Sequence, residues 1–229
     1  TTLFRSVTPL VTIFSGVGLS MLIAAPIGAA ASQVGTLIMW ATEQAPLVMG
    51  ILVSVIVGVA LTLPISSAAI CAALGLTGLA GGAAVAGCCA QMIGFAVMSY
   101  KENGVGGLVS QGLGTSMLQM GNIVKNPRIW IAPTLASAIT GPLATCVFHF
   151  EMNGAAVSSG MGTCGLVGQI GVYTGWVSDI AAGTKAAITP MDWAAMVLLC
   201  FVLPAVLSVI FCEIERKLGW IKEGDLKLN

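Results

Sequence analysis

Charged residues are scarce in this sequence. Asp, Glu, Lys and Arg make up 8% of the 229 residues, apolar residues make up 57%, and the mean hydropathy is +0.98. Because soluble domains carry about 25% charged residues, this composition excludes an ordinary soluble domain and predicts an integral membrane protein. Nine basic residues balance nine acidic residues and form no basic run, which argues against nucleic acid as a partner.

Residue types that bind metals or catalyse reactions are also scarce. The sequence has a single histidine, His149, and its seven cysteines include no C-x-x-C pair. No H-E-x-x-H motif is present either. We therefore expect no metal site, no cofactor and no catalytic residue on this chain, and we expect the cysteines to be small buried side chains. An intramembrane protease that uses His149 as its base is the enzymatic alternative that the residues leave open.

Long apolar segments predict the fold. A helix needs about 20 mostly apolar residues to cross a bilayer, and four segments meet this requirement: residues 7–31, 46–63, 129–148 and 193–211. Two shorter Ala- and Gly-rich stretches, 66–80 and 83–98, join at Gly81 and Gly82 and predict two short spans or one helical hairpin. We expect an all-α polytopic membrane protein, one domain over residues 1–229, with about four to six transmembrane helices. A start at Thr1 rather than Met is what a fragment lacking N-terminal spans would show.

A polar phrase punctuated by glycine occurs twice, as VSQGLGTS at 109–116 and as VSSGMGTC at 157–164. The copies lie 48 positions apart, and six of the ten aligned positions that begin at Gly106 and Gly154 are identical. The same offset places residues 83–98 over 131–146, so each copy follows an apolar segment. We interpret the chain as containing two repeat units, approximately 83–122 and 131–170.

The two segments that carry this phrase, 105–121 and 155–175, are too apolar for solvated loops and too interrupted for lipid-facing helices. Irregular backbone at membrane depth is tolerated only inside protein or beside a water-filled cavity. We therefore expect two re-entrant polar-glycine segments that enter from opposite faces, which is the inverted repeat found in many transporters. The alternative is that the glycines only let membrane helices approach one another closely.

The basic residues indicate an orientation. The sides are assigned for a chain in which residues 66–98 cross the membrane twice or not at all, and in which both polar-glycine segments return to the side that they left. Only Lys185 then faces one side, and the other side holds Arg5, Lys101, Lys125, Arg128, Arg216, Lys217, Lys222 and Lys227. The positive-inside rule places this second side in the cytoplasm, together with the C-terminal tail, residues 213–229. We interpret the tail as a solvated end, with an interfacial helix as the alternative.

Thirteen polar residues in or beside the two segments are predicted to bind a substrate. His149, Glu151 and Asn153 lie at the end of a span, where an ionisable group is costly unless it is paired or faces water. The alternative is that they only end the helix among lipid headgroups. The neutral amides and hydroxyls suit a hydroxyl-bearing ligand, with hydrogen bonds between helices as the alternative. The set is Ser110, Gln111, Thr115, Ser116, Gln119, Asn122, His149, Glu151, Asn153, Ser158, Ser159, Thr163 and Gln169. Asp179 and Asp192 are expected at the membrane interface.

The run ENGVGGLVSQGLGTSMLQMGNIVKNPRIWIAPTLASAITGPLATCVF (102–148), followed by GMGTCGLVGQIG (160–171), resembles a known family. It is similar to the membrane component, enzyme IIC, of a branch of the bacterial sugar phosphotransferase system that includes perfringolysin-regulator-like proteins. The resemblance implies a homodimer in the bacterial plasma membrane that contacts lipid and carries a sugar inward, while separate cytoplasmic phosphoryl-carrier proteins phosphorylate the sugar. It supplies no set of binding residues, so the thirteen residues above rest on the physical argument alone.

Three functions remain in view. A sugar or polyol transporter fits the repeat and its neutral polar residues. A membrane-bound regulator with the same architecture fits a chain that lacks a phosphoryl-carrying domain. A carrier of an apolar solute fits the apolar composition and the 11 methionines.

Overall fold

The computed structural model describes residues 2–228, and within α1 it does not describe the side chains of residues 2–10 and 19–25, among them that of Arg5. Within the described residues the chain is helical, and the only strand-like pairing is an isolated bridge between Gly78 and Met152. The helices are α1 (Thr2–Gln44), α2 (Pro46–Thr62), α3 (Ser67–Leu74), α4 (Gly78–Met98), α5 (Tyr100–Val109), α6 (Met120–Lys125), α7 (Ile131–Pro142), α8 (Val167–Ala181), α9 (Pro190–Val197) and α10 (Leu203–Lys217). Shorter π-helical and 3₁₀ segments connect several of them.

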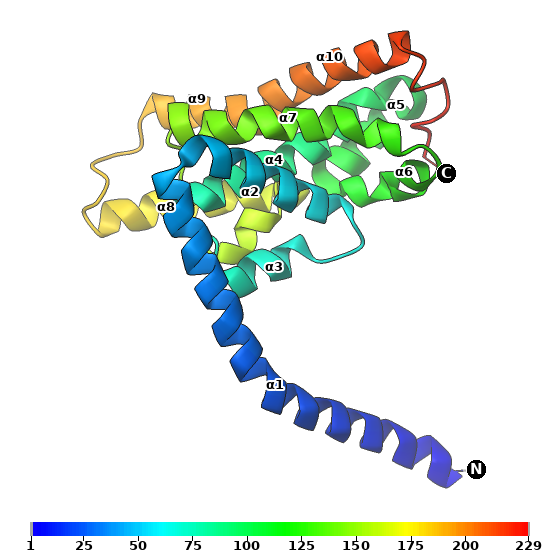
Figure 1. Cartoon of the computed structure of the whole chain (residues 1–229), viewed down its shortest axis with the longest axis vertical. Helices are drawn as coiled ribbons and strands as arrows, with labels where there is room; N and C mark the ends of the chain where they lie inside the picture. The colour runs from blue at the N-terminus through cyan, green and yellow to red at the C-terminus, as the bar shows by residue number, and fades with distance from the viewer. Residues whose placement is uncertain (1, 229) are drawn as a thin grey trace.

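Among the described residues, three continuous helical stretches are long and apolar enough to cross a membrane: Gly78–Met98, Pro127–Val147 and Pro190–Lys217. The shorter apolar helix α2 lies beside them. These spans confirm the all-α, polytopic class. The first predicted span is part of a longer helix, α1, which ends only where Pro46 forces Ala45 out of the helical conformation. The N-terminal half of α1 extends away from the rest of the molecule (Figure 1).

The central bundle is formed by α2, α4, α7 and α10. Helices α2 and α4 are parallel, because Cys88 contacts the Val57 carbonyl and Gln91 contacts Thr62. Helix α7 runs the opposite way, since its N-terminal end, near Trp130, contacts Gln91, whereas Ser137, further along, contacts Gly87. The C-terminal ends of α2, α4 and α10 therefore lie at one end of the bundle, beside α5, α6 and the C-terminus (Figure 1).

The break between the two Ala- and Gly-rich helices lies at residues 75–77, so the predicted join at Gly81 and Gly82 is wrong. Helix α3 ends at Gly75, which has φ +64°, the left-handed conformation that favours glycine. Gly81 and Gly82 lie inside α4, where a methyl group on Gly82 would overlap the Phe150 carbonyl oxygen. These two glycines therefore permit close packing and do not end a helix.

The backbone leaves the α-helical conformation in both polar-glycine segments. In the first, α5 passes into a π-helical turn, Ser110–Gly114, and Thr115 is extended at φ −159° and ψ 141° before the chain resumes as a 3₁₀ turn. In the second, a 3₁₀ turn, Ala156–Gly160, leads through residues with positive φ into α8. The matched residue Thr163 has φ −85° and ψ 2°, so the two copies differ in local conformation although both are irregular.

The two segments approach from opposite ends of the bundle. The first starts beside Ser99 at the C-terminal end of α4 and returns to Asn126 at the same end. The second starts near Gly78 at the other end of α4, reaches Cys88 and Cys89, and returns along α8. Figure 1 shows the corresponding separation, with the α8–α9 connection at one end and the C-terminus at the other.

The C-terminal tail is folded against the protein, so its interpretation as a solvated end is wrong. Ile221 and Leu226 are 3% and 0% exposed and belong to a cluster with Phe95 and Ile129. Apolar residues at intervals in a charged tail can be buried when a groove receives them. Here the groove is formed by the bundle end and the α5–α6 region.

Candidate functional site

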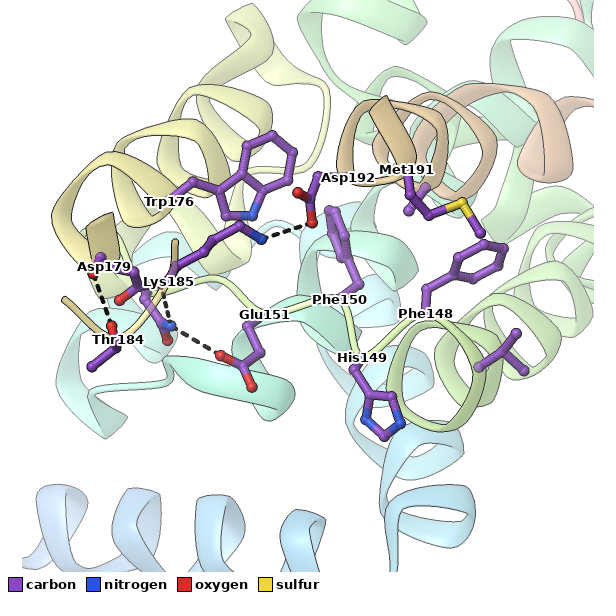
Figure 2. A pocket seen from close by; sticks show the side chains of 13 residues that line it. Phe148, His149, Phe150, Glu151, Trp176, Asp179, Thr184, Lys185, Met191 and Asp192 are labelled. Atoms are coloured by element: carbon purple, nitrogen blue, oxygen red, sulfur yellow. Dashed lines mark hydrogen bonds and ion pairs between the residues drawn. The ribbon is translucent and has the colours of Figure 1, made fainter. Parts of the chain in front are cut away.

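A pocket of about 530 Å³ opens at the end of the bundle opposite the C-terminal tail. Figure 2 shows the side chains that line it. Its walls come from the end of the 127–147 span, the linker that follows it, α8, the α8–α9 connection and the start of α9. The lining residues are Val147, Phe148, His149, Phe150, Glu151, Asn153, Trp176, Asp179, Thr184, Lys185, Met191, Asp192 and Ala195. The volume lies within the range of small-molecule sites.

The linker at 148–153, F-H-F-E-M-N, contributes both aromatic and polar side chains to this pocket. Around Met152, which forms an isolated bridge with Gly78, the chain is extended, and successive side chains point to opposite sides. Phe150 and Met152 are buried at 3% and 0% exposure, whereas Glu151 between them is exposed. Met152 exchanges two backbone hydrogen bonds of 3.0 Å with Gly78, which fixes the linker to the start of α4.

The polar groups of the pocket form two clusters (Figure 2). The Asn153 amide donates to the carboxylates of Glu151 and Asp179, at 3.0 and 2.9 Å. On the other side, the Lys185 ammonium lies 2.7 Å from the Asp192 carboxylate, and its nitrogen lies 5.5 Å from the centre of the Trp176 ring. The pocket thus holds three carboxylates and one ammonium group. These groups can form hydrogen bonds with hydroxyl groups, and the excess of carboxylates disfavours the binding of anions.

His149 has a backbone strain that yields a prediction. Its φ of +44° is uncommon for a residue other than glycine. We expect His149→Gly to unfold at the same or a slightly higher temperature and His149→Val to lose about 1–3 kcal/mol of stability, because a β-branched residue tolerates this conformation least. Thermal unfolding of the purified variants in detergent measures the difference. Equal unfolding temperatures for the two variants would contradict the assignment of strain to this residue.

Only three of the thirteen predicted binding residues line this pocket: His149, Glu151 and Asn153. Sequence reasoning missed Asp179, Lys185 and Trp176 as pocket residues, because they lie far along the chain and reach the pocket only through the fold. The position of the three that were found, directly after a predicted span, was the signal in the sequence.

A second group of predicted residues lies at the opposite end of the bundle, with protein groups as partners. The Gln111 amide donates to Ser99 Oγ at 2.7 Å and accepts from Gln119 at 2.9 Å. Asn122 donates to Gln119 at 2.7 Å. Gln119 and Asn122 also donate to main-chain carbonyls of the C-terminal tail, each at 3.0 Å. Ser110 donates to the Gly107 carbonyl within its own helix.

Ser116 belongs to a buried polar network that the sequence did not reveal. Its hydroxyl lies 2.9 Å from that of Thr62, which contacts Gln91 Oε1 at 3.3 Å. The Trp130 indole donates to the same oxygen at 3.0 Å, and the Gln91 amide donates to Thr134 at 3.3 Å. This network joins the first polar-glycine segment to α2, α4 and the 127–147 span.

The two polar-glycine segments meet where Thr163 donates to the Gly112 carbonyl at 2.6 Å. The matched glycine of the second copy, Gly160, also accepts a hydroxyl through its carbonyl, from Ser67 at 2.7 Å. Ser159 donates to the Leu76 carbonyl at 2.6 Å. In both copies, therefore, the carbonyl of the glycine at the matched position accepts a hydrogen bond from a buried hydroxyl.

The remaining predicted residues also lie away from the pocket. Thr115 accepts a hydrogen bond from the Met117 backbone N–H, and Ser158 is buried. Gln169 donates to Cys89 Sγ at 3.2 Å, and within the described residues its Oε1 is buried with no hydrogen-bond partner. The described side chains contain no cluster of three His, Cys, Asp or Glu residues that could hold a metal ion.

Comparison with known protein families matches residues 5–228 to the family described as "Phosphotransferase system, EIIC". No curated protein and no solved structure matches the chain. The match spans nearly the whole chain, and the apolar helices described above are what a membrane component requires. The chain therefore belongs to the phosphotransferase system EIIC family, the sugar-transporting membrane components of that system.

Proposed function

We propose that the 530 Å³ pocket is the outward-facing sugar site, and that the two polar-glycine segments form the closed barrier beneath it. The observation that carries this proposal is the pair of carboxylates, Glu151 and Asp179, held together by the Asn153 amide inside the pocket. Carboxylate oxygens accept hydrogen bonds from sugar hydroxyls, and bonds to a charged group are stronger than neutral ones.

The charge of the pocket favours a neutral sugar over a phosphorylated one. Three carboxylates face one ammonium group, so a phosphate in the same space would be repelled. Phe148, Phe150 and Trp176 supply apolar wall for the carbon skeleton. A sugar that enters before phosphorylation and leaves as a phosphate would therefore bind here only before the transfer.

The contact between Thr163 and Gly112 is the proposed barrier. The two segments contribute irregular backbone and come from opposite ends of the bundle, as the halves of an inverted repeat would. Movement of the second segment together with α8, which carries Trp176 and Asp179, would separate this contact and carry the sugar past it. Alternate exposure of the pocket to the two sides would follow.

We further propose that the end of the bundle with the C-terminal tail is cytoplasmic. Seven described basic residues lie there, and Lys185 lies in the pocket at the other end. The phosphoryl-carrier proteins of the system would then meet the sugar at the tail end. The homodimer remains a prediction, for which exposed apolar side chains such as Phe14 and Trp40 on α1 offer surface to a second protomer or to lipid.

The test compares Glu151→Gln and Asp179→Asn with Glu43→Gln, an exposed carboxylate next to the start of α2, at the same end of the bundle as the pocket. Proteoliposomes with the partner proteins are first screened with radiolabelled hexoses, pentoses, hexitols and disaccharides, and the transported sugar is used for binding. We expect the two pocket variants to raise its Kd by about 10- to 100-fold, since a hydrogen bond to a charged group contributes about 1.5–3 kcal/mol. Glu43→Gln should leave the Kd unchanged. Unchanged Kd values for both pocket variants would place the site elsewhere.

A further inference from the structure

The C-terminal segment after α10 makes an unusual set of contacts for a chain end. Gly219 (φ +72°) and Gly224 (φ +92°) turn the chain back across the end of the bundle. Ile221 and Leu226 then insert into the cluster of Phe95, Ile123 and Ile129 between α4, α6 and the 127–147 span. Two residues of the segment 220–228 thus belong to the core, whereas Trp220 and residues 222–224 remain exposed.

The α5–α6 region holds this segment through its peptide groups. The Glu102 carboxylate accepts from the backbone N–H of Gly224 and Leu226, at 3.3 and 2.9 Å. The Asn103 amide donates to the Leu226 carbonyl and accepts from the Leu228 N–H, both at 2.8 Å. The Glu102 carboxylate and the Asn103 amide thus bind the main chain of this segment.

Three further amides bind the backbone of the same segment. Gln119 donates to the Leu226 carbonyl and Asn122 to the Lys227 carbonyl, each at 3.0 Å, and Asn126 donates to the Trp220 carbonyl at 2.9 Å. Seven hydrogen bonds from side chains of residues 102–126 therefore reach the backbone of residues 220–228. Arg216 also pairs with Glu102, at 3.1 Å with both side chains mostly buried.

These hydrogen bonds to the C-terminal segment are connected to the first polar-glycine segment. Gln119, which holds the Leu226 carbonyl, donates to Gln111 at 2.9 Å. Gln111 lies in the π-helical turn beside Gly112, whose carbonyl accepts from Thr163 of the second segment. One chain of hydrogen bonds and one peptide link thus connect the C-terminal segment to the contact between the two segments.

We propose that residues 220–228 form a C-terminal strap that positions the first polar-glycine segment and keeps the Gly112–Thr163 contact closed. Leu226 is its central positioning residue, because it is fully buried and its backbone receives three of the contacts. The inference rests on the proposed function, since it assigns the strap to the barrier of that path. Release of the strap frees the first segment and opens the tail end of the path.

The test compares Leu226→Ala, Asn103→Ala and a deletion of residues 220–229 with Leu218→Ala, whose leucine is 58% exposed just before the strap. Each protein is placed in liposomes without phosphoryl-carrier proteins, and passage of the transported sugar down its gradient is measured together with its Kd and the unfolding temperature. We expect the strap variants to raise this uncoupled passage by about tenfold while the Kd changes less than about twofold, because the closed state alone is weakened. Leu218→Ala should match the unmodified protein.

A synthetic peptide of sequence WIKEGDLKLN, added to the deletion variant, should restore low passage. A strap that only stabilises the fold would lower the unfolding temperature without raising passage in any variant, and that result would overturn the proposal. If the deletion variant does not fold, Leu226→Ala and Asn103→Ala decide the matter, because each leaves at least five of the seven backbone contacts available. Failure of the proposed sugar site is a separate result, since it appears as an unchanged Kd in Glu151→Gln.

Discussion

Gly82→Ala is expected to prevent accumulation of the folded transporter. A methyl group at residue 82 would overlap the Phe150 carbonyl oxygen, which belongs to the backbone and not to a flexible side chain. The linker cannot easily move aside, because the Phe150 N–H donates to Ala144 at 2.8 Å and Met152 is paired with Gly78. We expect a loss of more than about 3 kcal/mol of stability, as overpacking against fixed backbone gives at the severe end of its range.

The control for this substitution is Gly106→Ala. Gly106 is exposed within α5, and apart from its chain neighbours and the backbone of its own helix no atom lies within 4 Å of the position that its added methyl group would take. Alanine in a helix is favoured over glycine by about 0.8–1 kcal/mol, so this variant should be as stable as the unmodified protein or slightly more stable. Yield of monodisperse protein and unfolding temperature in detergent measure both. If Gly82→Ala and Gly106→Ala unfold at the same temperature, the linker at 148–153 can move aside. It would then not hold Glu151 in a fixed position.

The same glycine pair shows where the sequence misleads. In a soluble chain two adjacent glycines indicate a break in a helix. In membrane helices glycine also permits close packing, and the sequence does not distinguish the two roles. The helix start at Gly78 and the close approach of Phe150 become visible only when the linker is in place. By contrast, the starts of the segments predicted at 46–63, 129–148 and 193–211 agree with the observed helices within a few residues, because proline and polar residues interrupt the apolar runs there. The first of these segments forms α2, which is shorter than the membrane-crossing stretches.

The site was predictable in part for a similar reason. His149, Glu151 and Asn153 lie within five residues directly after an apolar segment, so the sequence alone places them together at one end of the bundle. Asp179 and Lys185 join them only through the path of α8 and the loop that follows it. For the amides at 111, 119 and 122 the sequence shows donors and acceptors but not their partners, and here they contact one another and the tail backbone.

Gln91 was missed because it stands alone in an Ala- and Gly-rich run. Its side chain is fully buried in the middle of the bundle, where a polar group is costly unless it is hydrogen-bonded. Its amide oxygen accepts from Trp130 and Thr62, and its nitrogen donates to Thr134. A single amide thus joins α2, α4 and the antiparallel 127–147 span.

Gln91→Leu is therefore expected to lower stability by about 1–3 kcal/mol, because the indole N–H of Trp130 loses its fully buried acceptor. Adding Trp130→Phe should recover part of that loss, since removing both partners leaves no unpaired donor. Gln33→Leu, at an exposed position of α1, is the matched control and should be neutral. Unfolding free energies of the two single variants and the double variant give the coupling between the pair. Strictly additive effects would mean that the indole does not depend on this amide.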